Sequence, residues 1–140
     1  MSIRFTRDQM LTPIREDADF ASWYVNEFMK TCLTQYWLSV SDDGKRDMVL
    51  NGRAQARAYG IDDIESQTHF ITFMWTIGPN FHLQPGFAEI AANRKLSGPD
   101  KINQFYDLPG DQATAAIHAA DDRYWYPEMI ATLKTRGEMT

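Results

Sequence analysis

The sequence contains few of the residue types that mark several classes of protein site. It has one cysteine, Cys32, which excludes an internal disulfide framework and every multi-cysteine zinc pattern. Acidic residues outnumber basic ones, 19 to 14, and the net charge is −5. Because an acidic surface repels the phosphate backbone, we expect no binding to nucleic acid.

Long apolar runs are also missing. No window approaches the roughly 18 consecutive apolar residues of a transmembrane helix, so we expect no membrane span. The opening segment MSIRFTRDQM has no apolar stretch of the kind found in signal peptides. We therefore expect a cytoplasmic location.

Motifs for catalysis and cofactor binding are absent as well. The 8 glycines are scattered singly and form no phosphate-binding loop, and no serine lies in G-x-S-x-G. Glu65 with His69 and His118 with Asp122 each provide two metal ligands, whereas a catalytic zinc usually takes three. The third histidine, His82, lies in a loop, and we expect a surface role for it. We predict no catalytic residue, no metal, no cofactor and no enzymatic activity.

The composition and the spacing of apolar residues predict an all-α protein. Hydrophobic residues make up 44% of the chain and charged residues 24%, which is typical of a globular protein. A length of 140 residues favours one domain, residues 1–140. Apolar residues at three- and four-residue spacing predict an irregular bundle of five to seven helices. The predicted helices cover about 16–38, 45–59, 64–77, 87–95, 97–108 and a region from 111 onward.

The segment 64–77 is predicted to be the central buried helix, because it is apolar nearly all round. Asp62 is expected to cap its N-terminus. Gly60 and Gly78 are expected to end the helices before them. Within the first helix, the apolar neighbours of Cys32 predict a buried thiol with a packing role.

Two groups of apolar side chains exceed what a small core requires. The first is Tyr124-Trp125-Tyr126, because consecutive aromatic residues cover much of a helix's circumference. The second lies in the loop 78–86 and just after it. Tyrosine and tryptophan are enriched at protein interfaces. We predict a partner-binding surface, with core packing as the alternative for each group, formed by Tyr124, Trp125, Tyr126, Phe81, Leu83 and Phe87.

Four segments in the middle of the chain form a recognisable pattern: Arg57-Ala58-Tyr59-Gly60-Ile61, Phe70 to Met74, Gly78-Pro79-Asn80-Phe81, and Pro85. This pattern resembles that of a group of small bacterial proteins encoded beside the spike proteins and effectors of type VI secretion systems. The opening Ile3 to Gln9 is also similar. Together these matches span roughly residues 3–9 and 53–105.

The resemblance implies an accessory role and supplies no catalytic residue. The expected function is that of an adaptor or chaperone that binds a secreted effector or a spike component. One alternative is an immunity protein that neutralises a toxic effector. Another is a small hydrolase, for instance one acting on peptidoglycan, with Glu65, His69 or the pair Asp121 and Asp122 in its site.

Overall fold

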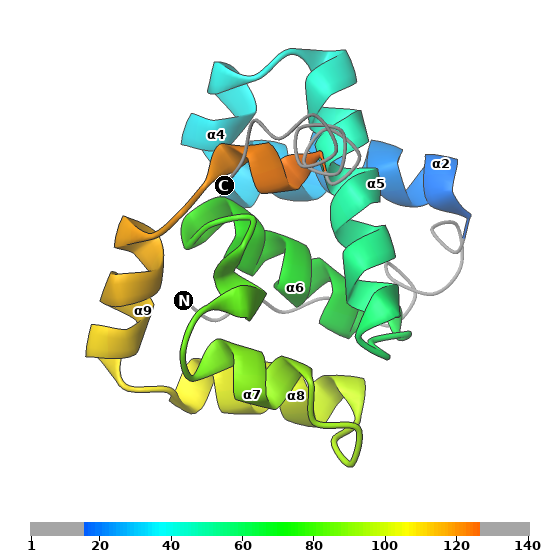
Figure 1. Ribbon diagram of the computed structural model, residues 1–140. Helices are drawn as coiled ribbons and strands as arrows, with labels where there is room; N and C mark the ends of the chain where they lie inside the picture. The colour runs from blue at the N-terminus through cyan, green and yellow to red at the C-terminus, as the bar shows by residue number, and fades with distance from the viewer. Residues whose placement is uncertain (1–15, 127–140) are drawn as a thin grey trace, which may run out of the picture.

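The computed structural model describes residues 16–126, and this part of the chain is all-α, as predicted (Figure 1). The similar opening at residues 3–9 lies outside the described residues. Within 16–126 there is no strand, and seven helices form if the continuous run 17–32 counts as one. The elements are α2 (Asp17–Trp23), η1 (Tyr24–Met29), α3 (Lys30–Cys32), α4 (Thr34–Ser39), α5 (Asp42–Ala58), α6 (Ile64–Thr76), η2 (Phe81–Leu83), α7 (Phe87–Ala91), α8 (Gly98–Asp107), α9 (Gly110–His118) and η3 (Asp122–Trp125).

The first helix combines α-helical ends with a π-helical middle, η1. One row of its buried side chains recurs every four residues, at Ala21, Val25, Met29 and, just after the helix, Leu33. A spacing of four lies between the roughly 3.6 residues per turn of an α-helix and the roughly 4.4 of a π-helix. Mixing the two windings therefore keeps one row of side chains facing the core over three turns.

The predicted helix 16–38 is interrupted at Leu33, whose φ of −129° and ψ of 47° leave the helical region. The chain resumes as α4 in a new direction. The prediction that Cys32 is buried was wrong, because its thiol is exposed. The buried row reaches the break through Met29 and Leu33, and Cys32 lies beside that row and faces outward.

Helix α5 begins at Asp42, earlier than predicted, because the Ser41 hydroxyl accepts a hydrogen bond from the Gly44 N–H and caps it. It ends at Ala58, and Gly60, the residue predicted to stop it, adopts φ +78° just after the C-cap Tyr59. Arg53, on the same helix, is buried. Its guanidinium donates to Gln67 Oε1 and Asp17 Oδ1 at 2.8 and 2.9 Å.

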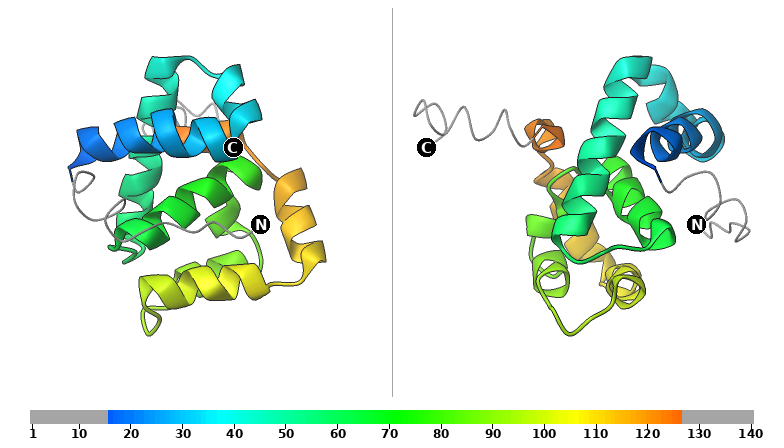
Figure 2. Two further views of the ribbon diagram at one scale, coloured as in Figure 1. Left: turned by 180° about the vertical axis from the view of Figure 1, so that it is seen from behind. Right: turned by 90° about the vertical axis from the view of Figure 1, so that its right-hand side faces the viewer.

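Helix α6 is the central helix, as predicted, and both Phe70 and Met74 are buried. Its cap is Asp63, one residue later than expected, and the Asp63 carboxylate accepts from the Ser66 N–H. In the left view of Figure 2 the first helix crosses in front of α5, α6 lies below the first helix, and α7 and α8 lie below α6.

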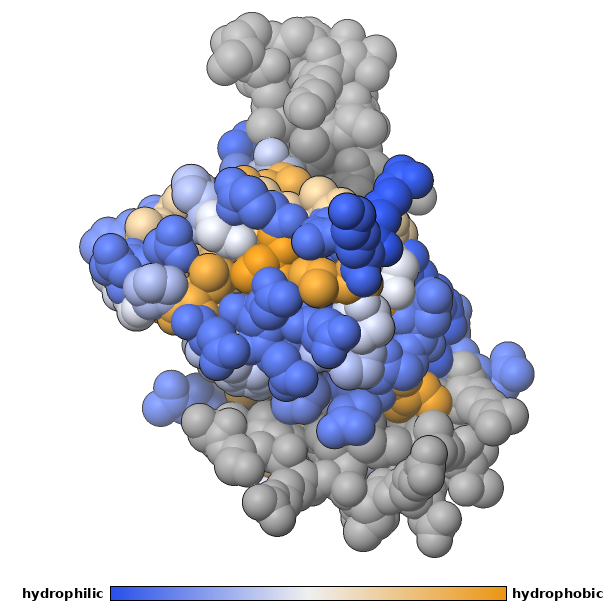
Figure 3. Space-filling model, turned by 90° about the horizontal axis from the view of Figure 1, so that it is seen from below, coloured by the Kyte–Doolittle hydropathy of each residue, from blue (hydrophilic) through white to orange (hydrophobic). Residues whose placement is uncertain are grey.

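The second half of the described chain wraps this centre in short helices. The face over α7 and α8 is mainly hydrophilic, with a band of hydrophobic residues across it (Figure 3).

A Cβ on Gly78 would lie 2.7 Å from the Ala120 Cβ, so glycine lets the segment after α9 pack against the end of α6. The Asn80 side chain fixes this approach by bonding Ala119 O and Asp121 N.

Across residues 16–126, every helix falls short of the length and apolar character that crossing a bilayer requires.

Candidate functional site

The structure separates the six residues predicted to form a partner-binding surface. Phe81 and Phe87 are buried, and their rings meet at 5.6 Å within the core. Phe81 also contacts the Phe70 ring of α6, at 5.0 Å. For these two residues the expected exposure was wrong, and the alternative of core packing is correct. Leu83 between them is 47% exposed.

The aromatic triplet is divided in a similar way. Trp125 is 3% exposed, and its ring lies 4.4 Å from that of Trp75 on α6. Its expected exposure was therefore wrong, whereas Tyr124 and Tyr126 are half-buried. The triplet covers the last two residues of the 3₁₀ turn η3 and the residue after it, and only its central side chain is fully buried.

Two amides of α5 hold η3 in place. Asn51 Nδ2 donates to Trp125 O at 2.8 Å, and Gln55 Nε2 donates to Tyr124 O at 3.2 Å. Because residues four apart share one face of a helix, both amides reach the same turn. The backbone of η3 is thereby fixed against α5, and the Trp125 ring is directed toward α6.

Trp125 and Tyr126 nevertheless line a cavity of about 470 Å³, which we call the aromatic groove. Its walls come from α4, α5, α6, α9 and η3. Sequence patterns did not identify this site, because its other residues look like ordinary helix positions and meet only through the fold. Besides Trp125 and Tyr126, the groove includes Tyr36, Met48, Met74, Trp75 and Ile117.

Trp75, which lines the groove, has an unused hydrogen-bond donor. The Trp75 indole Nε1 is buried and has no acceptor among the described residues. A buried donor without a partner costs about 1–3 kcal/mol. The rim of the groove is open, since Ile117 is 49% exposed and Tyr36 is 36% exposed. The groove thus offers apolar surface, and one residue of its wall, Trp75, has an indole N–H that no acceptor in residues 16–126 uses.

The residues suggested for a hydrolase are divided between α6, which carries Glu65 and His69, and the segment after α9, which carries Asp121 and Asp122. His69, four residues after Glu65, shares a hydrogen bond of 2.9 Å with the Tyr106 hydroxyl, and burial lowers its pKa. Asp121 pairs with Arg123 at 2.7 Å, beyond the far end of the helix. At a rise of about 1.5 Å per residue, the seven residues from His69 to the end of α6 at Thr76 span roughly 10 Å. The fold does not assemble them into one site.

His82 is buried, which corrects the expected surface role. Its ring lies among Tyr59, Phe70 and Phe81, at centroid distances of 5.2 to 5.4 Å. Burial lowers the pKa of His82 to about 4, so the side chain is neutral at pH 7. In the part of the chain that the structure describes, no three His, Cys, Asp or Glu side chains gather in a way that would hold a metal ion.

Comparison of the chain with protein-family models, with curated proteins and with solved structures gives no match.

Proposed function

We propose that this chain is a non-enzymatic accessory protein that binds a segment of a partner protein in the aromatic groove. The observation on which the proposal rests is the unpartnered Trp75 indole N–H in a wall of aromatic and methionine side chains. Aromatic and methionine residues are enriched where proteins bind one another. A partner that supplies a carbonyl oxygen removes the cost of the buried donor.

The expected occupant is an extended segment with apolar side chains. Backbone carbonyls within a helix are already bonded, apart from those of its last turn, whereas an extended chain offers carbonyls along its length. Asp122 lies on the groove wall and is exposed, and the protein as a whole carries a charge of −5. These charges favour a basic residue beside the apolar part of the segment.

The resemblance described above makes a type VI secretion effector or spike component the partner to test. In this proposal the protein acts as an adaptor or chaperone and holds that partner before secretion. The same groove also serves the alternative role of an immunity protein. An immunity protein has to block the toxin, whereas an adaptor has to deliver the toxin intact. The two roles therefore differ in whether cells that make the toxin survive.

The test measures the affinity of the full-length protein for effector and spike proteins encoded beside its gene. Trp75→Phe removes the indole N–H and keeps an aromatic ring, and it is expected to weaken binding about tenfold. Ile117→Asp places a charge on the exposed rim and is expected to weaken binding at least as much. Leu38→Asp is the matched control, because Leu38 is 71% exposed and lies outside the groove.

Equal losses for Leu38→Asp and Ile117→Asp would contradict the groove as the binding site. If the partner binds, co-expression with the toxic effector separates the two roles. Survival of the co-expressing cells indicates an immunity protein. An adaptor would not rescue these cells, and deletion of its gene would instead stop secretion of the effector. Cleavage of peptidoglycan that is lost in His69→Ala would favour the hydrolase instead.

A further inference from the structure

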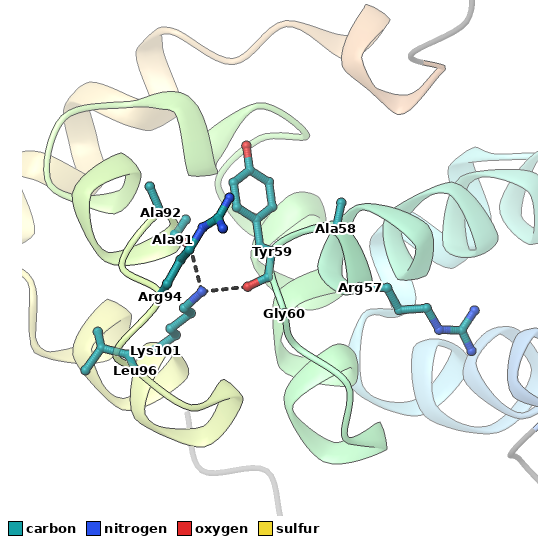
Figure 4. A pocket seen from close by; sticks show the side chains of 9 residues that line it. All are labelled: Arg57, Ala58, Tyr59, Gly60, Ala91, Ala92, Arg94, Leu96 and Lys101. Carbon is teal, nitrogen blue, oxygen red and sulfur yellow. Dashed lines mark hydrogen bonds between the residues drawn. The ribbon is translucent and has the colours of Figure 1, made fainter.

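A second cavity of about 500 Å³, the basic pocket, lies where the C-terminal ends of α5 and α7 meet α8 (Figure 4). The charged side chains that line it are Arg57, Arg94 and Lys101, and all are cations. The other lining residues that matter here are apolar: Ala58, Ala92 and Leu96. A concentration of positive charge is notable in a protein whose net charge is −5.

Lys101 is the buried cation of this pocket, with 3% of its surface exposed. Its Nζ donates to Tyr59 O at 2.6 Å and to Ala91 O at 2.7 Å, and so joins the ends of α5 and α7. A lysine ammonium has three N–H donors, and these two carbonyls use two of them. Within residues 16–126, no carboxylate forms an ion pair with Lys101.

Arg94 brings a second positive charge to the same place. It extends from the turn after α7 over the cavity, next to Tyr59 (Figure 4). The Arg94 side chain is exposed and makes no ion pair within the described residues. Burial and the charge of Arg94 both lower the pKa of Lys101, so the two cations oppose each other. An anion between them would remove this repulsion.

Arg57 differs from Arg94 in where its side chain points and in having a carboxylate as its ion-pair partner. Its guanidinium points away from the cavity (Figure 4) and pairs with Asp17 at 3.2 Å. The positive charge available to a ligand therefore comes from Arg94 and Lys101.

We propose that the basic pocket binds a small organic oxyanion, a carboxylate or a phosphate monoester. The forked donors of Arg94 would bind the oxygen atoms, because the guanidinium geometry matches such groups. Lys101 would contribute its charge and its third N–H. Ala58, Ala92 and Leu96 would contact an apolar body attached to the anionic group. This site is separate from the aromatic groove and does not depend on the function proposed for it.

The test titrates the full-length protein with inorganic phosphate, phenyl phosphate, benzoate and the neutral analogue benzamide, followed by calorimetry and amide chemical shifts. We expect saturable binding of at least one oxyanion and none of benzamide. Arg94→Gln should weaken binding about tenfold or more, since a charge-assisted pair is lost. Arg46→Gln is the control, because Arg46 is exposed on α5 and does not line the pocket.

Two outcomes would overturn the proposal: no saturable binding of any oxyanion, or equal affinities for Arg94→Gln and the unaltered protein. A preference for phenyl phosphate over benzoate, or the reverse, identifies the anionic group. Lys101→Met is a second variant, expected to abolish binding. Because Arg94 is exposed, Arg94→Gln keeps its fold and the test stays decisive even if Lys101→Met unfolds.

Discussion

The aromatic groove and the basic pocket have nearly equal volumes, about 470 and 500 Å³, but they are built in different ways. Buried core residues, among them Met74, Trp75 and Trp125, form walls of the groove. The pocket is formed by helix ends and by the exposed side chain of Arg94. Substitutions in the groove wall should therefore alter both stability and binding. Substitutions at the rim of the pocket should alter binding with little effect on stability.

Trp125→Ala tests the coupling of folding and binding at the groove most strongly. It removes a ring that packs 4.4 Å from Trp75 and leaves a large cavity. We expect a loss of about 3–5 kcal/mol in the free energy of unfolding. Urea denaturation, followed by circular dichroism, measures this loss.

Leu38→Ala is the control for this comparison, because Leu38 is exposed and outside the groove. It should change stability by less than about 0.5 kcal/mol. A change of similar size in both variants would show that the groove wall is not part of the core.

Acid should lower the stability of the protein through His82, whose ring contacts Tyr59 of the basic pocket. Its pKa is about 4 in the folded protein, below the ordinary 6.5, so the unfolded chain binds the proton first. Stability is therefore lost as the pH falls from about 6.5 to about 4, by about 3 kcal/mol in total. Urea denaturation at several pH values measures this dependence.

His82→Leu isolates the contribution of this one group. The variant keeps an apolar side chain among the aromatic rings and lacks the titration, so its stability should depend less on pH. His69 and Asp121, whose pKa values are also lowered, remain in both proteins. Identical pH profiles for the two proteins would contradict the assignment to His82.

The sequence predicted the framework of both sites better than the sites themselves. The all-round apolar pattern of 64–77 predicted the central helix, and Gly60 predicted where α5 ends. These features depend on local preferences and on one face of one helix. The break at Leu33 and the π-helical stretch depend on what the first helix packs against, and so the local pattern did not reveal them.

The site residues were harder to predict because exposure is a property of the whole fold. Phe81 and Trp125 stood out as excess aromatic residues, yet the rings of Phe70 and Trp75 cover them. Lys101 gave no signal at all, because a lysine near the start of a helix usually lies in solvent. Its burial follows from two carbonyls contributed by α5 and α7, 42 and 10 residues away.

Lys101→Met asks how much the buried cation contributes to the fold apart from any ligand. The variant keeps a similar length and leaves two carbonyl oxygens without their charged donor. We expect a loss of about 2 kcal/mol, since the unpaired carbonyls outweigh the relief from burying a charge. Thermal and urea denaturation measure it, with Lys95→Met, exposed in the turn before α8, as the control. An unchanged stability would mean that the Lys101 contacts contribute nothing net to folding.

The smallest effect expected at the groove comes from the hydrogen bonds that position η3. Asn51→Ala removes the donor to Trp125 O, one of the two amide contacts between α5 and this turn. We expect a loss of about 1 kcal/mol in stability, the usual contribution of one hydrogen bond. The η3 turn should be affected more than the rest of the molecule, because the backbone of Trp125 then has one fewer hydrogen bond to α5. The hydrogen-exchange rate of the η3 amides should therefore rise. The exchange rate in α6 should rise only as far as the loss in the free energy of global unfolding requires. Equal acceleration in η3 and α6 would show that η3 opens only when the whole molecule unfolds.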